Sequence, residues 1–118
     1  MRIRKEFCPE LVIGPSLNDF HQDHQVIANE MVRAFKSTSS VISYELPWNH
    51  VTFNTQLFIK LTEANIKNKW ALLKRYNSQI IKGKSYFSED FIFGLAKTRG
   101  VQCGSEYAEA FEVVRWMI

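Results

Sequence analysis

A short apolar run that leads into a polar helix start constrains this chain most. Residues 10–14 end in Leu11-Val12-Ile13-Gly14, a short apolar run bounded by Pro and Gly, which predicts a buried β-strand. Apolar residues at helical spacing then predict a helix over residues 20–36. A strand followed by a helix is the repeating unit of α/β proteins, whose chemistry gathers where a strand ends and the next helix begins.

The rest of the chain continues this alternation. The pattern predicts a strand over 41–46, an extended segment over 51–61, helices over 62–80 and 88–98, a turn at Arg99-Gly100, and a last strand over 106–116. Thr62 and Ser88 are the expected helix caps. The order strand, helix, strands, helix, helix, strand favours an α/β layered domain.

The bulk properties exclude several classes of protein. The 118 residues suffice for one domain or part of one. No apolar run approaches the roughly 20 residues that cross a bilayer, so no membrane association is expected. The charged start, residues 1–6, precedes no apolar stretch, so we expect no secretory signal and a cytoplasmic location. Cys8 and Cys103 form no C-x-x-C pair, which disfavours a disulfide framework.

Positive charge is unevenly distributed although the net charge is only +3. No acidic residue lies between Glu63 and Glu89, a stretch that contains Lys67, Lys69, Lys74, Arg75, Lys82 and Lys84. A solvated helix face explains this stretch most simply, and a surface for phosphate or another anionic ligand is the alternative.

Two histidines and two carboxylates lie together at the first predicted helix start, in the segment 19–24 (DFHQDH). Residues three apart share one side of a helix, so His21 and His24 are predicted to project together. Asp19, with Gln22 three residues later, fits a capping box. Such groups can hold a divalent metal and move protons. The spacing alone fits an ordinary polar helix turn at least as well, since a catalytic zinc usually takes three protein ligands.

Two further segments accompany this turn in the same order along the chain. The first segment runs from Pro9-Glu10-Leu11-Val12-Ile13 into the histidine turn, the second is 69–79 (KWALLKRYNSQ), and the third is 99–100 (RG) followed by 104–111 (GSEYAEAF). Together they resemble the LmbE/PIG-L family of zinc-dependent N-deacetylases, whose motifs are P-D-L-V with D-x-H-P-D-H, K-x-x-A-L-x-x-Y/H-x-S-Q, and R-G…G-x-x-Y-A-E-x-F. The resemblance covers nearly the whole chain.

The resemblance implies a role for each residue that matches a motif. His24 would be a zinc ligand, and His21 would face the substrate carbonyl as a general acid or oxyanion stabiliser. Asp23 would orient and tune His21, whereas Asp19 would cap the helix. The candidate substrate-binding residues are Arg99, Tyr107 and Glu109, with packing in a terminal strand as the alternative for Tyr107 and Glu109.

The family's A-H-P-D-D-E motif, which supplies two more zinc ligands and the general base, has no counterpart here. The chain therefore resembles the C-terminal half of such an enzyme, with residues 1–118 forming a single partial domain. The implied fold is an incomplete, three-layer Rossmann-like sheet with flanking helices. A partner chain that supplies the N-terminal half would cover the first strand, which otherwise presents an open sheet edge.

The implied activity is zinc-dependent removal of an acetyl group from an N-acetylated sugar or sugar conjugate. Whether this chain is itself an enzyme stays open, and we expect the isolated chain to be inactive. The alternative is a non-catalytic remnant or binding module that holds an anionic glycan or a nucleotide-sugar. A nucleic-acid partner is not expected, because no recognisable nucleic-acid-binding module is present.

Overall fold

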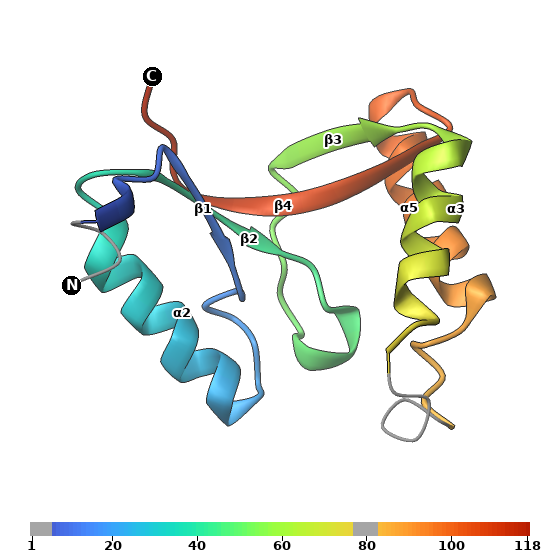
Figure 1. Ribbon diagram of the computed structural model, residues 1–118, viewed down its shortest axis with the longest axis horizontal. Coiled ribbons are helices and arrows are strands. Elements are labelled where there is room, and N and C mark those ends of the chain that lie inside the picture. Colours follow the sequence, from blue (N-terminus) through green and yellow to red (C-terminus); the bar gives the residue numbers. More distant parts are fainter. Residues whose placement is uncertain (1–5, 77–82) are drawn as a thin grey trace. The chain divides into compact units, whose positions relative to one another are not determined.

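The computed structural model describes residues 6–76 and 83–118. Its elements are β1 (Leu11–Gly14), α2 (Gln22–Phe35), β2 (Ser40–Tyr44), a short 3-10 helix η1 (Pro47–Asn49), β3 (Leu57–Leu61), α3 (Glu63–Leu73), α5 (Glu89–Cys103) and β4 (Tyr107–Arg115) (Figure 1). The four strands form one mixed sheet in the order β1-β2-β4-β3. The predicted α/β class is therefore confirmed.

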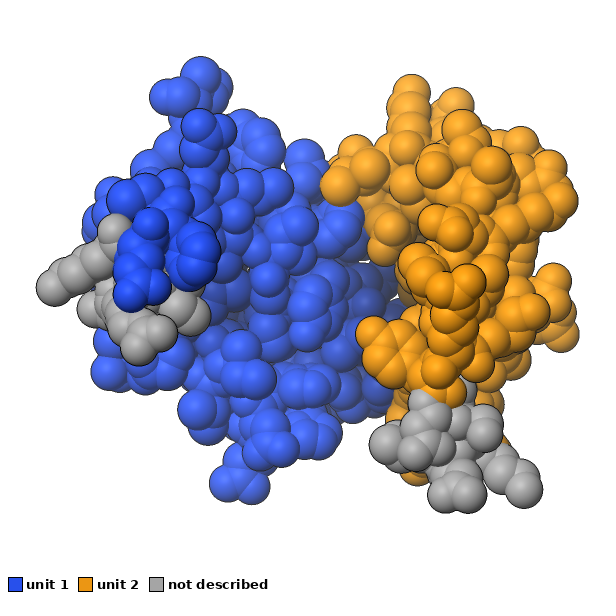
Figure 2. Space-filling model, in the orientation of Figure 1, with its two compact units in different colours: residues 1–57, 110–118 blue, residues 58–109 orange. Residues whose placement is uncertain are grey.

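The chain divides into two compact units, coloured separately in Figure 2. The first unit comprises residues 1–57 and 110–118, and it contains β1, α2, β2 and most of β4. The second unit comprises residues 58–109, and it contains most of β3, then α3, α5 and the start of β4.

In the first unit, β1, α2 and β2 form a strand–helix–strand crossover. β1 and β2 pair in parallel, with Leu11 opposite Ser40 and Gly14 opposite Ser43. Helix α2 packs on these strands and buries Ala28, Met31 and Ala34. The contact is close at Gly14, where a Cβ atom would overlap the Met31 sulfur. A small residue at this strand end therefore lets the helix approach the sheet.

Strand β2 is buried between two neighbours. It pairs with β4 in the antiparallel direction, with a register shift between Val41 and Ile42. Val41 and Ile42 are fully buried. By contrast, β1 lies at the end of the strand order, and its Leu11 and Ile13 side chains are about half exposed. Among the described strands, β1 is thus an edge strand, as its sequence implied.

The second unit packs α3 against α5 beside the start of β4. Ile66 of α3 and Ala96 of α5 are buried. Phe93 meets the Tyr107 ring edge-on, with the ring centroids 6.0 Å apart. Both predicted caps are confirmed, since Thr62 accepts the backbone N–H of Asn65 and Ser88 accepts that of Phe91.

Several predicted boundaries are wrong. The predicted turn at Arg99-Gly100 lies inside α5, which continues to Cys103 and ends at Gly104 in the left-handed conformation (φ 73°). Within the extended segment 51–61, only 57–61 forms a strand. The first helix spans 22–35 rather than 20–36. The predicted end of the 62–80 helix falls partly outside the described residues, and α3 is described to Leu73.

Gly100 allows α5 to lie directly against the backbone that follows it. A Cβ atom at this position would come within 2.6 Å of the carbonyl oxygens of Ser105 and Glu106, and backbone atoms cannot swing aside. Gly94 belongs to the same helix, and a Cβ atom there would meet nothing within 4 Å.

We therefore predict opposite effects for two glycine-to-alanine substitutions. Gly100→Ala should lower the free energy of unfolding by about 1–3 kcal/mol through overpacking. Gly94→Ala should raise it by about 0.5–1 kcal/mol through its better helix propensity. Urea denaturation of both variants measures this difference, and equal effects would contradict the packing assigned to Gly100.

Candidate functional site

The candidate site is built around the buried carboxylate of Asp19. The side chain is 1% exposed and follows the loop that leaves β1. Its Oδ1 accepts the backbone N–H of His21 at 2.7 Å, and its Oδ2 lies 2.9 Å from Nδ1 of His24. Both carboxylate oxygens therefore bond to the two histidines that the sequence singled out.

The expected capping box of Asp19 and Gln22 is wrong. The N-cap of α2 is His21, whose Nδ1 accepts the backbone N–H of Asp23 at 3.2 Å. Asp19 lies two residues before this cap. Its carboxylate instead bonds the backbone N–H of the cap residue and reaches His24 in the first turn. Asp19 thus holds the backbone of His21 and the ring of His24, and it does not cap the helix.

The hydrogen bonds assign a different tautomer to each histidine when both rings are neutral. An ionised carboxylate only accepts, so Nδ1 of His24 carries the proton that Asp19 binds, and Nε2 keeps its lone pair. Nδ1 of His21 accepts a backbone N–H, so the proton of that ring lies on Nε2. One ring thus offers an acceptor atom and the other a donor atom.

The two rings lie together, as the i, i+3 spacing predicted. The imidazoles of His21 and His24 stack with centroids 4.4 Å apart and an interplanar angle of 26°. The His24 side chain is 28% exposed, and His21 and Asp23 are exposed. The contact between Asp23 and His21 uses the backbone amide of Asp23.

The charge of Asp19 also acts on Tyr44, at the end of β2. Burial raises the pKa of the Tyr44 hydroxyl above its ordinary value of 10.0, and the nearby Asp19 carboxylate raises that pKa further. The Tyr44 hydroxyl therefore keeps its proton to a higher pH than an ordinary tyrosine does.

A second buried carboxylate, Glu112 of β4, holds the loop that presents Asp19. Glu112 is 7% exposed. Its Oε1 accepts the Ser16 hydroxyl, and its Oε2 accepts the Asn18 side-chain amide at 3.1 Å. Oε2 also accepts the backbone and side-chain N–H groups of Asn54 at 3.0 and 3.3 Å. The sequence analysis did not identify Glu112. The feature that could have identified it is an acidic residue within an otherwise apolar stretch of the last strand.

The candidate substrate-binding residues lie in the second unit, whereas the histidine pair lies in the first. Glu109 is paired with Lys69 at 3.3 Å. Tyr107 packs against Phe93, and the ammonium group of Lys97 lies over its ring. Nη1 of Arg99 donates to the Gln102 side chain at 2.9 Å. These contacts are those of residues that stabilise a packed strand and helix.

Several residues of the basic stretch have partners within the chain. Lys67 pairs with Glu63 at 3.2 Å, Lys69 pairs with Glu109, and Lys74 lies over the Trp70 ring. Lys82 lies outside the described residues. The contacts of the three paired lysines suit a solvated helix surface.

The third histidine, His50, has its described contacts with Leu46 and Phe53. Its Nε2 accepts the backbone N–H of Leu46 at 3.2 Å, and its ring stacks on Phe53. Across residues 6–76 and 83–118, no group of three or more His, Cys, Asp or Glu side chains is arranged to hold a metal ion. The same part of the chain contains no helix both long and apolar enough to cross a bilayer.

Comparison with protein families and with curated proteins found no relative of this chain. No protein-family model matches the chain, and no curated protein matches it. The site must therefore be interpreted from its own geometry.

We predict a distinct tautomer for each neutral histidine. His24 and His50 should carry the proton on Nδ1, and His21 should carry it on Nε2, because each opposite nitrogen has the contact described above. Long-range ¹H–¹⁵N correlation spectra distinguish the two forms. Asp19→Asn should weaken the Nδ1–H preference of His24 and leave that of His50 unchanged. An Nε2-protonated His24 in the unsubstituted protein would contradict the assignment.

Proposed function

We propose that this chain provides the histidine-bearing half of a zinc-dependent hydrolase that removes an acetyl group from an N-acetylated sugar or sugar conjugate. The observation that carries the proposal is the contact between Asp19 and Nδ1 of His24. Metal-binding histidines usually donate their other ring N–H to a carboxylate or carbonyl, which fixes the tautomer and raises the basicity of the ligand atom. His24 has this arrangement.

The donor atoms fit zinc at one position. Imidazole nitrogen is a preferred zinc ligand, and His24 is partly exposed with its Nε2 lone pair available. His21 does not fit as a second ligand in its assigned tautomer, because its Nε2 carries a proton. When bound, zinc supplies Lewis-acid polarisation of the acetyl carbonyl and activates a water molecule.

His21 is suited to a different task beside the ligand. Its Nε2–H can donate a hydrogen bond to the oxygen that gains negative charge as the amide is attacked. The same proton can pass to the leaving amine. The stacking keeps this ring beside the imidazole of His24, which would hold the ion. Asp23 fixes the ring of His21 through its backbone amide.

The proposal requires further zinc ligands and a general base, since catalytic zinc sites usually have three protein ligands. We propose that they come from a partner segment that pairs with the open edge of β1. Ligand-binding residues in parallel sheets gather at the carboxyl ends of neighbouring strands. A parallel strand added to β1 would end beside the loop that leads to Asp19 and His24, and it would extend the sheet toward a Rossmann-like fold.

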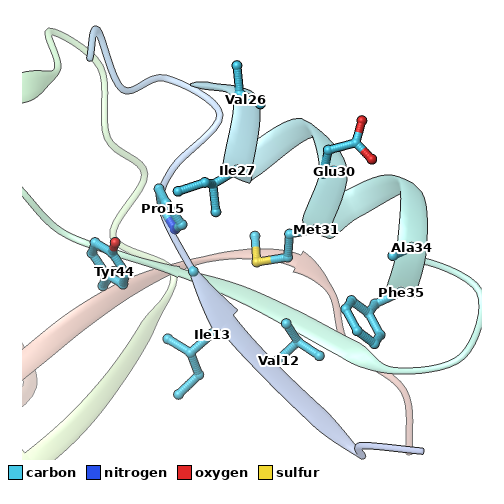
Figure 3. A pocket seen from close by; sticks show the side chains of 11 residues that line it. Val12, Ile13, Pro15, Val26, Ile27, Glu30, Met31, Ala34, Phe35 and Tyr44 are labelled. Carbon is cyan, nitrogen blue, oxygen red and sulfur yellow. The ribbon is translucent and has the colours of Figure 1, made fainter. Parts of the chain in front are cut away.

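An apolar groove beside this edge supports docking of such a segment. The groove has a volume of about 550 Å³ and lies between β1 and α2 (Figure 3). Val26 and Ile27 of α2 line it and are 60% and 52% exposed, whereas helices that cover parallel strands normally bury such residues. Ile13 and Tyr44 line the groove from the sheet.

The isolated chain should bind zinc weakly through His24 and hydrolyse no N-acetylglucosamine conjugate at a useful rate. His24→Ala should abolish the weak binding, and His50→Gln should preserve it. Isothermal titration with zinc measures both variants. An affinity unchanged by His24→Ala would remove His24 as a ligand, and zinc-dependent turnover by the isolated chain would refute the need for a partner segment.

In an assembled enzyme with both halves, His21→Ala should lower kcat by about a hundredfold or more, as expected when one oxyanion donor is lost. His21→Gln retains a side-chain N–H and should lose less. Steady-state kinetics separate kcat from KM in both variants. An unchanged kcat in His21→Ala would exclude this histidine from the reaction.

A further inference from the structure

A polar cavity is lined in part by the loop that carries Asp19. Its volume is about 280 Å³. Leu17 and Asn18, Ser43 of β2, Asn54 and Gln56, and Glu112, Val113 and Val114 of β4 line it. All of these residues belong to the first unit. Ser43 and Glu112 are paired in the β2–β4 register, so their side chains lie on the same face of the sheet.

The carboxylate of Glu112 is buried here with neutral donors alone. Its hydrogen bonds come from one hydroxyl, two side-chain amides and one backbone amide. Among the described residues, no lysine, arginine or histidine forms an ion pair with it. A buried charge is costly unless it is compensated. A cationic ligand would supply the compensation that the surrounding side chains do not.

Ser43 provides a second, independent sign of a ligand. Its hydroxyl is buried and has no hydrogen-bond partner among the described residues. Ser43 lies directly opposite Glu112 in the β2–β4 register, and both residues line the cavity. Buried hydroxyls are normally hydrogen-bonded, so an unpaired one beside a carboxylate points to a group that the protein itself does not provide.

We propose that this cavity binds the primary ammonium group of a small organic ligand, with Glu112 as the counter-charge and the Ser43 hydroxyl as an acceptor. Oε2 of Glu112 already accepts three hydrogen bonds, whereas Oε1 accepts one. A guanidinium group prefers both carboxylate oxygens, but an ammonium group is a compact charge that needs one. Calcium prefers six to eight oxygen ligands, usually with several carboxylates.

The proposal does not depend on zinc chemistry. It rests on Glu112 and Ser43, whereas the hydrogen bonds assigned to His21 and His24 come from Asp19 and Asp23. Amine binding and zinc binding can therefore be measured separately, and one proposal can fail while the other holds.

The test is an NMR titration of the whole chain with ethanolamine hydrochloride at neutral pH and constant ionic strength. The expected result is saturable shifts of the backbone amides of Ser43, Asn54 and Val113. Ethylene glycol is the neutral probe and should give no saturable shift. Equal binding of ethylene glycol would overturn the role of charge. Saturation of the same amides by calcium chloride but not by ethanolamine would replace the amine site with a metal site.

Three variants separate binding from stability. Ser43→Ala should weaken ethanolamine binding at least threefold without lowering the thermal midpoint, because it removes a hydroxyl that has no partner. Glu112→Gln should weaken binding by about tenfold or more, as expected for loss of a charge-assisted bond. Glu106→Gln, an exposed glutamate of the second unit, should change nothing.

Ser43→Ala decides the question if Glu112→Gln fails to fold. Ethanolamine affinity unchanged in Ser43→Ala would overturn the proposal. An equal loss of affinity in Glu106→Gln would also overturn it, because the response would then report general charge attraction.

Discussion

Burial of the Asp19 carboxylate is the constraint on which the candidate site depends. A carboxylate withdrawn from water must have its oxygens satisfied, and the available donors are the backbone of His21 and the ring of His24. The position of the helix start and the orientation of the His24 ring are therefore set by one side chain. The pair of histidines becomes chemically unequal because Asp19 contacts only one of the two rings.

Glu112 stabilises the same loop from strand β4. It binds Ser16 and Asn18, which precede Asp19 by only a few residues, and it also binds Asn54. The loop after β1 is thus held between two acidic side chains, one from its own end and one from the last strand. This arrangement gives a short polar loop a defined conformation without a disulfide bond or a regular element, and it leaves the Glu112 carboxylate at the edge of a cavity.

The sequence predicted the local elements well and the polar contacts poorly. The strand–helix–strand unit over 11–44 was predictable because its apolar residues follow clear periods. The bond between Ser16 and Glu112 joins residues 96 positions apart, and no local pattern reports it. The spacing predicted that His21 and His24 share one side of the helix. It did not predict the bond to His24 from Asp19, which lies before the helix begins. The predicted helix ended too early because Gly100 suggests a turn when only the sequence is considered. The close backbone contact that requires glycine there is visible only in the structure.

The close approach at Gly100 also bears on how relatives of this chain could be recognised. Any side chain at this position would collide with backbone atoms, so related proteins that keep this arrangement must keep glycine there. Gly94 lies earlier in the same helix, where a Cβ atom would meet nothing within 4 Å, so other residues can replace it. Divergent sequences in which Gly100 is invariant and Gly94 varies would therefore indicate this helix–strand junction even where overall sequence identity is low.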